Sequence, residues 1–315
     1  FNSATDPYMG TTSVGVQIKH DGKEWGYADP TKTCYWPDAT TDLVFYGYTP
    51  FASAVVPGFT KAGGMVFTNY VVPTDVAAQK DFMWAYTSTK KAPNVAMAFN
   101  HALVRVNFKA KMVTPNMKVD IEANGITICN IMNKGTATVA PVTAPATPAV
   151  AWATAADATA QQIIVPSAAV TIENATVKDV SLIAADQAVM LMPQTFAAWD
   201  PQTGTITAVT APENKNGYLK VMCKIYSATA PVTYYHGTAT ESVGGAKDDY
   251  KPIYIPLSSI KLPSTDQIWK ANNNITYTLN FGGGYADDGT PILNPTLFTT
   301  TVKEWTKTDG GILPM

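Results

Sequence analysis

Charged side chains are scarce in this chain. Only 15% of its 315 residues are Asp, Glu, Lys or Arg, and the formal net charge is −2. A nearly neutral chain carries no electrostatic signature for nucleic acid or an anionic membrane surface, and no window approaches the ~18 continuous apolar residues of a membrane-spanning helix. Low charge is common instead in extracellular β proteins. No signal peptide is visible, but the chain opens abruptly at Phe1, as a trimmed or mature fragment would, so export is not excluded.

Cysteine is nearly absent. The three residues Cys34, Cys129 and Cys223 are odd in number and far apart, so they form neither a CxxC motif nor a disulfide framework. Cys223 shares the apolar face of an alternating segment with Leu219 and Ile225, which predicts a buried free thiol. A pairing of Cys34 with Cys129 stays open.

Catalytic motifs are also missing. The three histidines, His20, His101 and His236, are isolated in sequence, and no HExxH, GxSxG, P-loop or dinucleotide-binding motif occurs. The carboxylate pairs Asp248-Asp249 and Asp287-Asp288 are expected to be ordinary loop charge, because their spacing does not bring together the six or more oxygen ligands of a calcium site. The sequence therefore predicts no catalytic, cofactor-binding or metal-binding residues, and no enzyme.

The most informative pattern is the stretch Val95 to Lys111. Apolar and polar residues alternate along it, and the phase changes once, at Asn100-His101. Because side chains on a strand alternate with period two, one extra residue moves the apolar set to the other face. The pattern predicts two strands that meet at a bulge or corner, as where a strand crosses between packed sheets.

Strand signals recur along the rest of the chain with turn residues between them, whereas only Thr74–Asp81 could form a short helix. The fold class predicted is all-β. Since 315 residues exceed one ordinary domain, two sandwich domains are expected. Residues 135–162 are rich in Ala, Thr and Pro, and we interpret them as a linker, with a long surface loop as the alternative. The predicted domains are residues 1–145 and 146–315.

Three segments of the first half carry a family resemblance: AQKDFMWAYTS (Ala78–Ser88), AMAFNHALVRVNFKAKM (Ala96–Met112) and VDIEANGITICNIMNKGT (Val119–Thr136). They are similar to a Q-x-D-L-M-x-A strand, an F-x-H-A-L corner and an I-x-I-x-N strand ending at Lys-Gly-Thr, which follow one another in the fimbrillin family of Bacteroidales surface proteins. Other segments in the family's order are Thr33–Pro50, Ala188–Phe196, Gly217–Tyr226, Tyr254–Ser259, Asn272–Tyr285 and Phe298–Trp305. The resemblance spans nearly the whole chain.

The resemblance implies two tandem transthyretin-like (Greek-key) β-sandwiches, exported as a lipoprotein to the outer membrane or a fimbrium. It implies a pilus subunit or adhesin whose partners are other fimbrial subunits and surface glycans or proteins. Related subunits assemble by donor-strand exchange, in which proteolysis removes an N-terminal strand and a neighbour's strand fills the groove. The lipid anchor would lie upstream of Phe1.

Carried onto this chain, the resemblance makes Val14, Val16 and Ile18 the apolar side of the replaceable strand, with Lys19 and Lys23 as candidate processing sites. The candidate donor is the strand containing Phe298, Thr300, Val302 and Trp305, followed by the tail 306–315. The tail carries Gly310-Gly311 and Pro314, which suit an inserting strand poorly. That departure favours a tip or anchor subunit, and both segments could instead be ordinary first and last strands.

Two other functions remain open. A surface glycan- or glycoprotein-binding module that does not polymerise would show an exposed aromatic platform or a cleft. A glycosidase on a β scaffold would need two carboxylates roughly 5–10 Å apart in a cleft, and the sequence offers no such pair.

Overall fold

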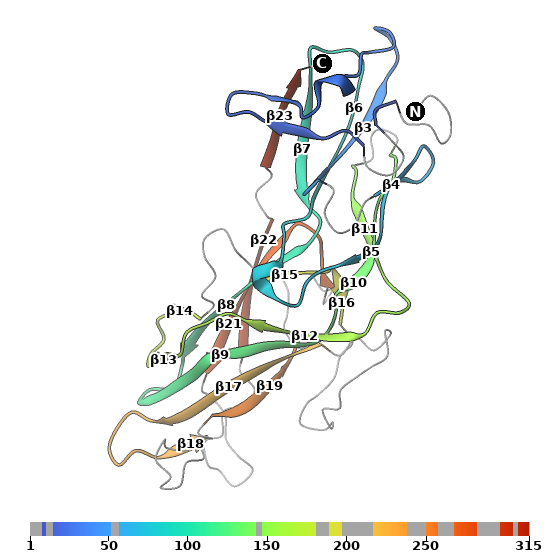
Figure 1. The fold of residues 1–315 in the computed structure, drawn as a ribbon. Coiled ribbons are helices and arrows are strands. Elements are labelled where there is room, and N and C mark those ends of the chain that lie inside the picture. The colour runs from blue at the N-terminus through green and yellow to red at the C-terminus, as the bar shows by residue number, and fades with distance from the viewer. Residues whose placement is uncertain are drawn as a thin grey trace.

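Strands make up nearly all of the regular structure, which confirms the all-β prediction (Figure 1). The structure is a computed structural model, and it describes residues 8–10, 15–51, 57–142, 147–180, 189–196, 217–237, 250–257, 268–281, 297–304 and 308–314. Within these ranges the helical elements are two single 3-10 turns, η1 (Pro30–Lys32) and η2 (Val76–Ala78). The short helix expected over Thr74–Asp81 is therefore only one turn, capped by the Asp75 carboxylate, which accepts a hydrogen bond from the Ala77 N–H at 3.0 Å.

Two four-stranded sheets enclose an aromatic core and form what we call the first lobe. Their strand orders are β23–β7–β6–β3 and β11–β10–β5–β4. Phe82 lies at the centre of this core, with its ring 4.6 Å from that of Phe67 and 4.7 Å from that of Tyr70. The strands are β3 (Leu43–Thr49), β4 (Gly58–Thr60), β5 (Gly64–Val71), β6 (Met83–Thr89), β7 (Asn94–His101), β10 (Lys134–Val139), β11 (Val150–Thr154) and β23 (Thr308–Pro314).

The second lobe has a mainly aliphatic core, with a few aromatic side chains, between a six-stranded and a five-stranded sheet. In the first of these sheets the order is β12–β9–β17–β18, with β13 also on β9 and β19 on β17. In the other sheet it is β14–β8–β21–β22, with β15 on β8. The strands are β8 (Val104–Met112), β9 (Met117–Met132), β12 (Ala160–Val165), β13 (Val170–Ile172), β14 (Lys178–Asp179), β15 (Val189–Leu191), β17 (Tyr218–Ser227), β18 (Tyr234–His236), β19 (Lys251–Pro256), β21 (Asn273–Phe281) and β22 (Leu297–Glu304).

Two small sheets complete the described structure. They pair β1 (Ile18–His20) with β2 (Trp25–Tyr27), and β16 (Gln194–Thr195) with β20 (Ile268–Trp269). Pairing between neighbouring strands is antiparallel except between β8 and β21, which run parallel. The more detailed transthyretin-like topology stays a prediction.

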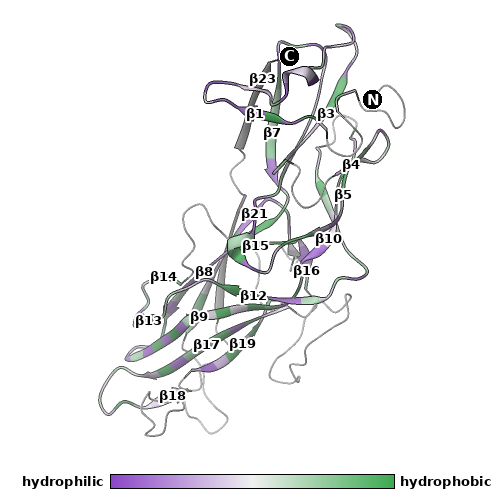
Figure 2. Cartoon of the chain, viewed as in Figure 1, coloured by the Kyte–Doolittle hydropathy of each residue, from purple (hydrophilic) through white to green (hydrophobic). Residues whose placement is uncertain are grey.

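Hydrophobic and hydrophilic residues alternate along β9 and β17 (Figure 2), as expected for strands with one face on a core. Cys223 on β17 is fully buried and free, which confirms the buried thiol, and burial raises its pKa. Cys34 and Cys129 are free as well.

The phase change at Asn100-His101 is the passage from one lobe to the other. β7 ends at His101 in the first lobe, and β8 begins at Val104 in the second. Between them Ala102 and Leu103 are buried in the first lobe's core. The corner predicted from the alternation is therefore present, and it joins sheets of different lobes.

The described parts of the segment 135–162, residues 135–142 and 147–162, are largely strand and not a linker or a surface loop. They contain most of β10, all of β11 and the start of β12, and Ala137 and Val139 on β10 are buried in the first lobe. This low-complexity sequence can form strand β10 because small apolar and polar residues still alternate along it. Pairing with β5 places β10 in a sheet with one buried face. Sheets thus join strands from both sides of the predicted boundary at residues 145 and 146, since β9 pairs with β17.

We predict that Tyr277→Phe destabilises the second lobe. The indole N–H of Trp269 donates a hydrogen bond to the Tyr277 hydroxyl at 2.7 Å, and both side chains are about 1% exposed. The substitution leaves this N–H buried without an acceptor, so the free energy of unfolding should fall by about 1–3 kcal/mol. Urea denaturation measures it. As a matched control, Tyr70→Phe should change stability much less at neutral pH, and an equal loss in both variants would contradict the assignment.

Stability should also fall between pH 10 and 12. Burial, with a contribution from Asp81, raises the pKa of Tyr70 to about 12 in the folded chain. The neutral phenol is thus favoured on folding, and its contribution is complete below pH 10 and is lost as the pH rises to 12. A pKa difference of two between the folded and unfolded chain corresponds to about 2–3 kcal/mol in the free energy of unfolding. The free energies of unfolding of the chain and of Tyr70→Phe should be nearly equal below pH 10 and should separate above it, because the variant has no phenol to ionise. Parallel pH dependences would exclude Tyr70 as a cause.

Candidate assembly site

Residues 15–42, which precede β3, form what we call the N-terminal arm. It begins with the hairpin β1–β2, in which Ile18 is paired with Tyr27 and the His20 and Trp25 rings lie 5.3 Å apart. It continues through η1 to a loop that carries Trp36. In the described part of this arm, β1 and β2 pair with each other, and neither strand pairs with a strand of the two lobes.

The predicted replaceable strand is only partly a strand. Val14 lies outside the described residues, Val16 is half-buried and precedes β1, and Ile18 is the first residue of β1. The predicted processing residues Lys19 and Lys23 are exposed on the hairpin, where Asp21 accepts hydrogen bonds from the backbone N–H groups of Lys23 and Glu24. Both lysines are accessible to a protease.

The arm meets the outer face of the sheet β23–β7–β6–β3, which is apolar. Its side chains form what we call the outer cluster: Phe45, Ala85, Val95, Met97 and Phe99, with Trp36 of the arm packed against them. The rings of Trp36 and Phe45 lie 5.7 Å apart in an edge-on arrangement, and Val95 is only 1% exposed. This sheet therefore buries apolar side chains on both faces.

Close packing on this face explains Gly47 on β3. A Cβ atom there would lie 3.0 Å from the Met97 Cε and 3.1 Å from the Phe99 Cζ, closer than side chains normally approach. In contrast, the indole N–H of Trp36 is buried without a hydrogen-bond partner. An unpaired buried donor costs free energy. Apolar contacts therefore hold Trp36 against the sheet, and the unpaired N–H weakens this docking.

The C-terminal strand β23 forms the edge of this same sheet. It pairs antiparallel with β7, with Ile312 opposite Ala96 and Leu313 opposite Val95. The register shifts between Asp309 and Ile312, at Gly310-Gly311, so the glycines that argued against an inserting strand lie at an irregularity of the ladder. β2 of the arm lies beside β23, so both terminal segments meet at β7 (Figure 1).

The predicted donor residues lie in the other lobe. Phe298, Thr300 and Val302 belong to β22, where they are opposite Leu279, Tyr277 and Ile275 of β21, and Trp305 lies outside the described residues. β22 is an edge strand of the five-stranded sheet. The sequence thus identified β22, whereas the tail strand β23, which it judged unsuitable, is the one paired across to the first lobe.

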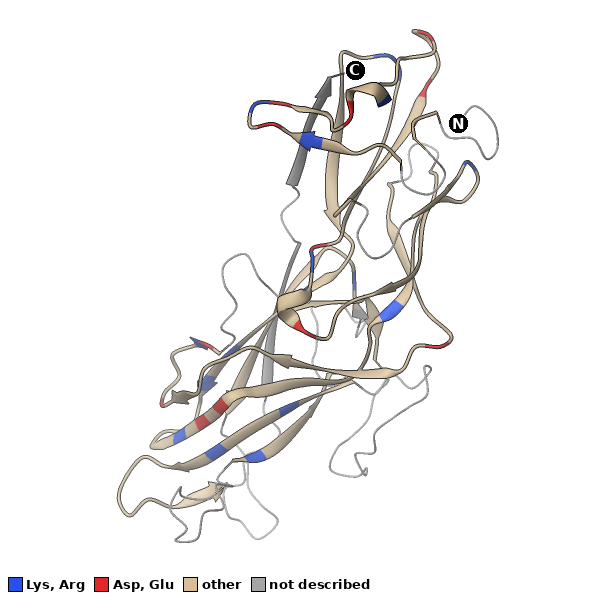
Figure 3. Cartoon of the chain, in the orientation of Figure 1, with Lys and Arg blue, Asp and Glu red and all other residues tan. Residues whose placement is uncertain are grey.

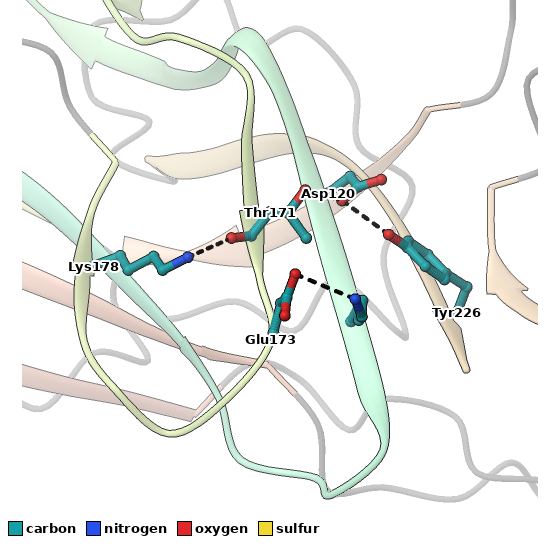
Figure 4. A network of polar contacts seen from close by, with 6 residues as sticks. Asp120, Thr171, Glu173, Lys178 and Tyr226 are labelled. Atoms are coloured by element: carbon teal, nitrogen blue, oxygen red, sulfur yellow. Dashed lines mark hydrogen bonds and ion pairs between the residues drawn. The ribbon is translucent and has the colours of Figure 1, made fainter. Parts of the chain in front are cut away.

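Charged residues are sparse on the described strands, and several lie on neighbouring strands of the six-stranded sheet (Figure 3). Here Asp120 accepts hydrogen bonds from the Thr171 hydroxyl at 2.6 Å and the Tyr226 hydroxyl at 3.2 Å (Figure 4). The Lys224 ammonium lies 3.8 Å from the same carboxylate, and Lys118 pairs with Glu173 at 3.2 Å. These contacts fasten β13, β9 and β17 together.

This sheet also carries tyrosines, the residues expected of a glycan-binding platform. The Tyr226 and Tyr234 rings lie 5.2 Å apart, and burial raises the pKa of Tyr226 to about 12. However, the Tyr226 hydroxyl is engaged by Asp120, and the Lys224 ammonium lies 5.0 Å from the Tyr250 ring centre. The groups bind one another, so we assign them a structural role.

Within the described ranges, no group of three or more His, Cys, Asp or Glu side chains is arranged to hold a metal ion. His101 instead lies 2.9 Å from a carboxylate oxygen of Asp81, and His236 lies 3.0 Å from the backbone oxygen of Lys251. No described helix is long and apolar enough to cross a bilayer.

A family model described as fimbrillin-like matches residues 2–305. Two solved structures, of proteins to which a role in cell adhesion is ascribed, are similar at low identity. One, from Bacteroides ovatus ATCC 8483, is 11% identical with a TM-score of 0.41, over 93% of this chain and 79% of that one. The other, from Parabacteroides distasonis ATCC 8503, is 12% identical with a TM-score of 0.34, over 81% and 78%. No curated protein matches.

We predict that Trp36→Ala loosens the arm without unfolding the lobes. Losing the indole contact should weaken docking by about 1–2 kcal/mol, which corresponds to a roughly tenfold larger undocked population. Cleavage at Lys19 and Lys23 should accelerate, and hydrogen exchange should increase in residues 15–42 and not in β9. Tyr35→Ala is the matched control, because the neighbouring Tyr35 side chain is 75% exposed. Equal protease sensitivity in both variants would show that Trp36 does not hold the arm.

Proposed function

Because this chain belongs to the fimbrillin-like family, we propose that it is a non-enzymatic cell-surface subunit of a fimbria that assembles by exchange of its C-terminal strand. The observation that supports this most directly is the pairing of β23 with β7 at a sheet edge. This edge belongs to the first lobe, whereas β22, which precedes β23, belongs to the second. The tail thus reaches from one lobe to complete the other.

Such a strand is chemically replaceable by its own copy. An edge strand offers backbone N–H and C=O groups that any strand of matching register can pair with. A second subunit's β23 would present the same backbone bonds to β7 as the first subunit's own strand. Exchange therefore changes which chain supplies the strand and not how many bonds form.

The arm supplies a means of control. It lies against the apolar outer face of the same sheet, and β2 lies beside β23. Cleavage after Lys19 or Lys23 would separate β1 from β2 and weaken this cover. β23 would then leave β7 more readily, and a neighbour's strand could take its place.

The partners we propose are other copies of this chain or other fimbrial subunits, at the cell surface or in a fimbrium. A lipid anchor upstream of residue 1 would attach the protein to the outer membrane. The irregular pairing at Gly310-Gly311 shortens the regular ladder, which favours a tip or anchor position over a stalk position.

Limited digestion with a lysine-specific protease tests the proposal. Cleavage at Lys19 or Lys23, confirmed by mass spectrometry, should convert monomers into SDS-resistant oligomers. The double variant Lys19→Arg, Lys23→Arg should resist the protease at these sites and stay monomeric. Complete cleavage that leaves only monomers would overturn the role in strand exchange.

A disulfide lock identifies the exchanged strand. Ala96→Cys and Ile312→Cys face one another in the β7–β23 register, and Cys34→Ser removes the partly exposed native thiol. The oxidised variant should remain monomeric after cleavage, and the reduced variant should polymerise. Oligomers that form while the disulfide is closed would show that β23 is not the strand exchanged.

A further inference from the structure

A hollow of about 450 Å³ lies where the two lobes meet. Four segments surround it: the end of β5, the loop that contains η2, the turn between β9 and β10, and the connection from β11 to β12. Its polar lining is made by Thr74, Asp75, Asn133, Lys134, Asp157, Thr159 and Gln161. Binding sites for small molecules are frequent at junctions of this kind.

Backbone bonds hold the β5 side of the hollow in place. The Asn133 side-chain amide donates to the Val72 carbonyl at 2.8 Å, and the Val72 N–H donates to the Asn133 carbonyl at 2.8 Å. The loop that follows is fixed by Gln79, whose amide donates to the Pro73 carbonyl at 2.9 Å and whose amide oxygen accepts from the Met190 N–H at 2.8 Å. Gln79 is buried, so this wall is tied to both lobes.

The opposite wall is held by ionic and amide contacts. Lys134 forms an ion pair with Asp157, and this contact holds the pKa of the Asp157 carboxyl below its usual range. The Gln161 amide donates to the Thr159 hydroxyl at 2.8 Å and to the Thr159 carbonyl at 3.1 Å. The lining side chains are therefore positioned by the protein before any ligand arrives.

Several polar groups of the lining keep hydrogen-bonding capacity for a ligand after these contacts are counted. Asp75 uses one carboxylate oxygen to cap η2, and Asp157 uses one for Lys134, so each has a second oxygen. Asn133 and Gln161 use their amide N–H groups and retain their amide oxygens. Lys134 retains two of its three donors.

The lining has two further properties that select a ligand. Two carboxylates against one ammonium leave one net negative charge, which disfavours phosphate, sulfate and acidic sugars. The apolar members, Val71, Pro73 and Ala158, offer a small non-aromatic surface. These properties exclude anionic ligands, and they suit a neutral ligand that is rich in hydroxyl groups and apolar on one face.

We propose that this hollow binds a neutral pyranose sugar of a surface glycan. The ring hydroxyls would donate to Asp75, Asp157 and Gln161, a hydroxyl oxygen would accept from Lys134, and the C–H face would lie on Val71 and Pro73. This activity adds attachment to the proposed assembly role and does not require strand exchange. The monomer binds the sugar whether or not it polymerises.

The test uses the full chain as a monomer. A glycan array should show binding to neutral terminal hexoses or N-acetylhexosamines, and not to sialylated or sulfated glycans. Saturation-transfer NMR with free glucose, galactose, mannose and N-acetylglucosamine, followed by titration, measures the affinity. Absence of binding to every neutral sugar, or preference for the anionic glycans, would overturn the proposal.

Matched variants locate the site. Asp75→Asn keeps the cap of η2 and removes the carboxylate charge, and Gln161→Ala removes one acceptor. Each should weaken sugar binding at least about tenfold, as expected for loss of a bond to a sugar hydroxyl. Gln162→Ala is the control, because Gln162 is exposed on the same strand and does not line the hollow. Binding that is equal in all three variants would place the sugar elsewhere and overturn the proposal.

Because assembly is measured after proteolysis and sugar binding on the intact monomer, the two proposals fail separately. Loss of polymerisation with normal sugar binding would leave an adhesin that does not polymerise. Polymerisation without sugar binding would leave a subunit with no ligand in this hollow.

Discussion

The structure depends on the burial of Ala102 and Leu103, between β7 and β8. Both side chains are at most 1% exposed, and bonds from separate parts of the chain hold their backbone. The Ala102 N–H donates to the Phe82 carbonyl and the Trp152 indole donates to the Ala102 carbonyl, both at 2.8 Å, while the Asn272 N–H donates to the Leu103 carbonyl at 3.1 Å. Every second side chain of a strand points to the same face, so one regular strand cannot supply the cores of both lobes in turn. The fixed segment Ala102-Leu103 breaks the alternation and lets the chain pass from the first lobe to the second.

The same crossing sets the position of the chain ends. Once β8 has entered the second lobe, the chain returns for β10 and β11 and again for β23 (Figure 1). The N-terminal arm and the C-terminal strand thus meet on one sheet of the first lobe. The arm is held by apolar contact and carries the unpaired indole N–H of Trp36. Segments held in this way belong to the low-stability end of a fold, where opening is easiest.

Two of the crossings also form one wall of the polar hollow, since the turn between β9 and β10 and the connection from β11 to β12 both join the lobes. A single shallow site for one sugar ring binds weakly, because few atoms are buried. A polymer that presents one such site in each subunit gains avidity without any new contact. The proposed assembly and the proposed sugar site would therefore support one function, which is adhesion through many weak contacts. The low charge of the chain suits this role, because neutral glycans offer no ionic partner.

Local patterns in the sequence were enough to predict the all-β class, the corner at Asn100-His101 and the buried thiol of Cys223. These features depend on alternation, which neighbouring residues express directly. The family was predicted from a resemblance of motifs that follow one another in the same order. Only the tertiary structure decided that residues 135–162 supply β10 and β11, that β23 pairs with β7, and that Trp36 covers an outer apolar cluster. It also brought Asp75, Lys134 and Asp157 to one hollow from segments far apart in the chain. The partner of a strand is decided by contacts between segments that are far apart in the chain. The sequence of one strand alone does not determine which sheet it joins or at which edge.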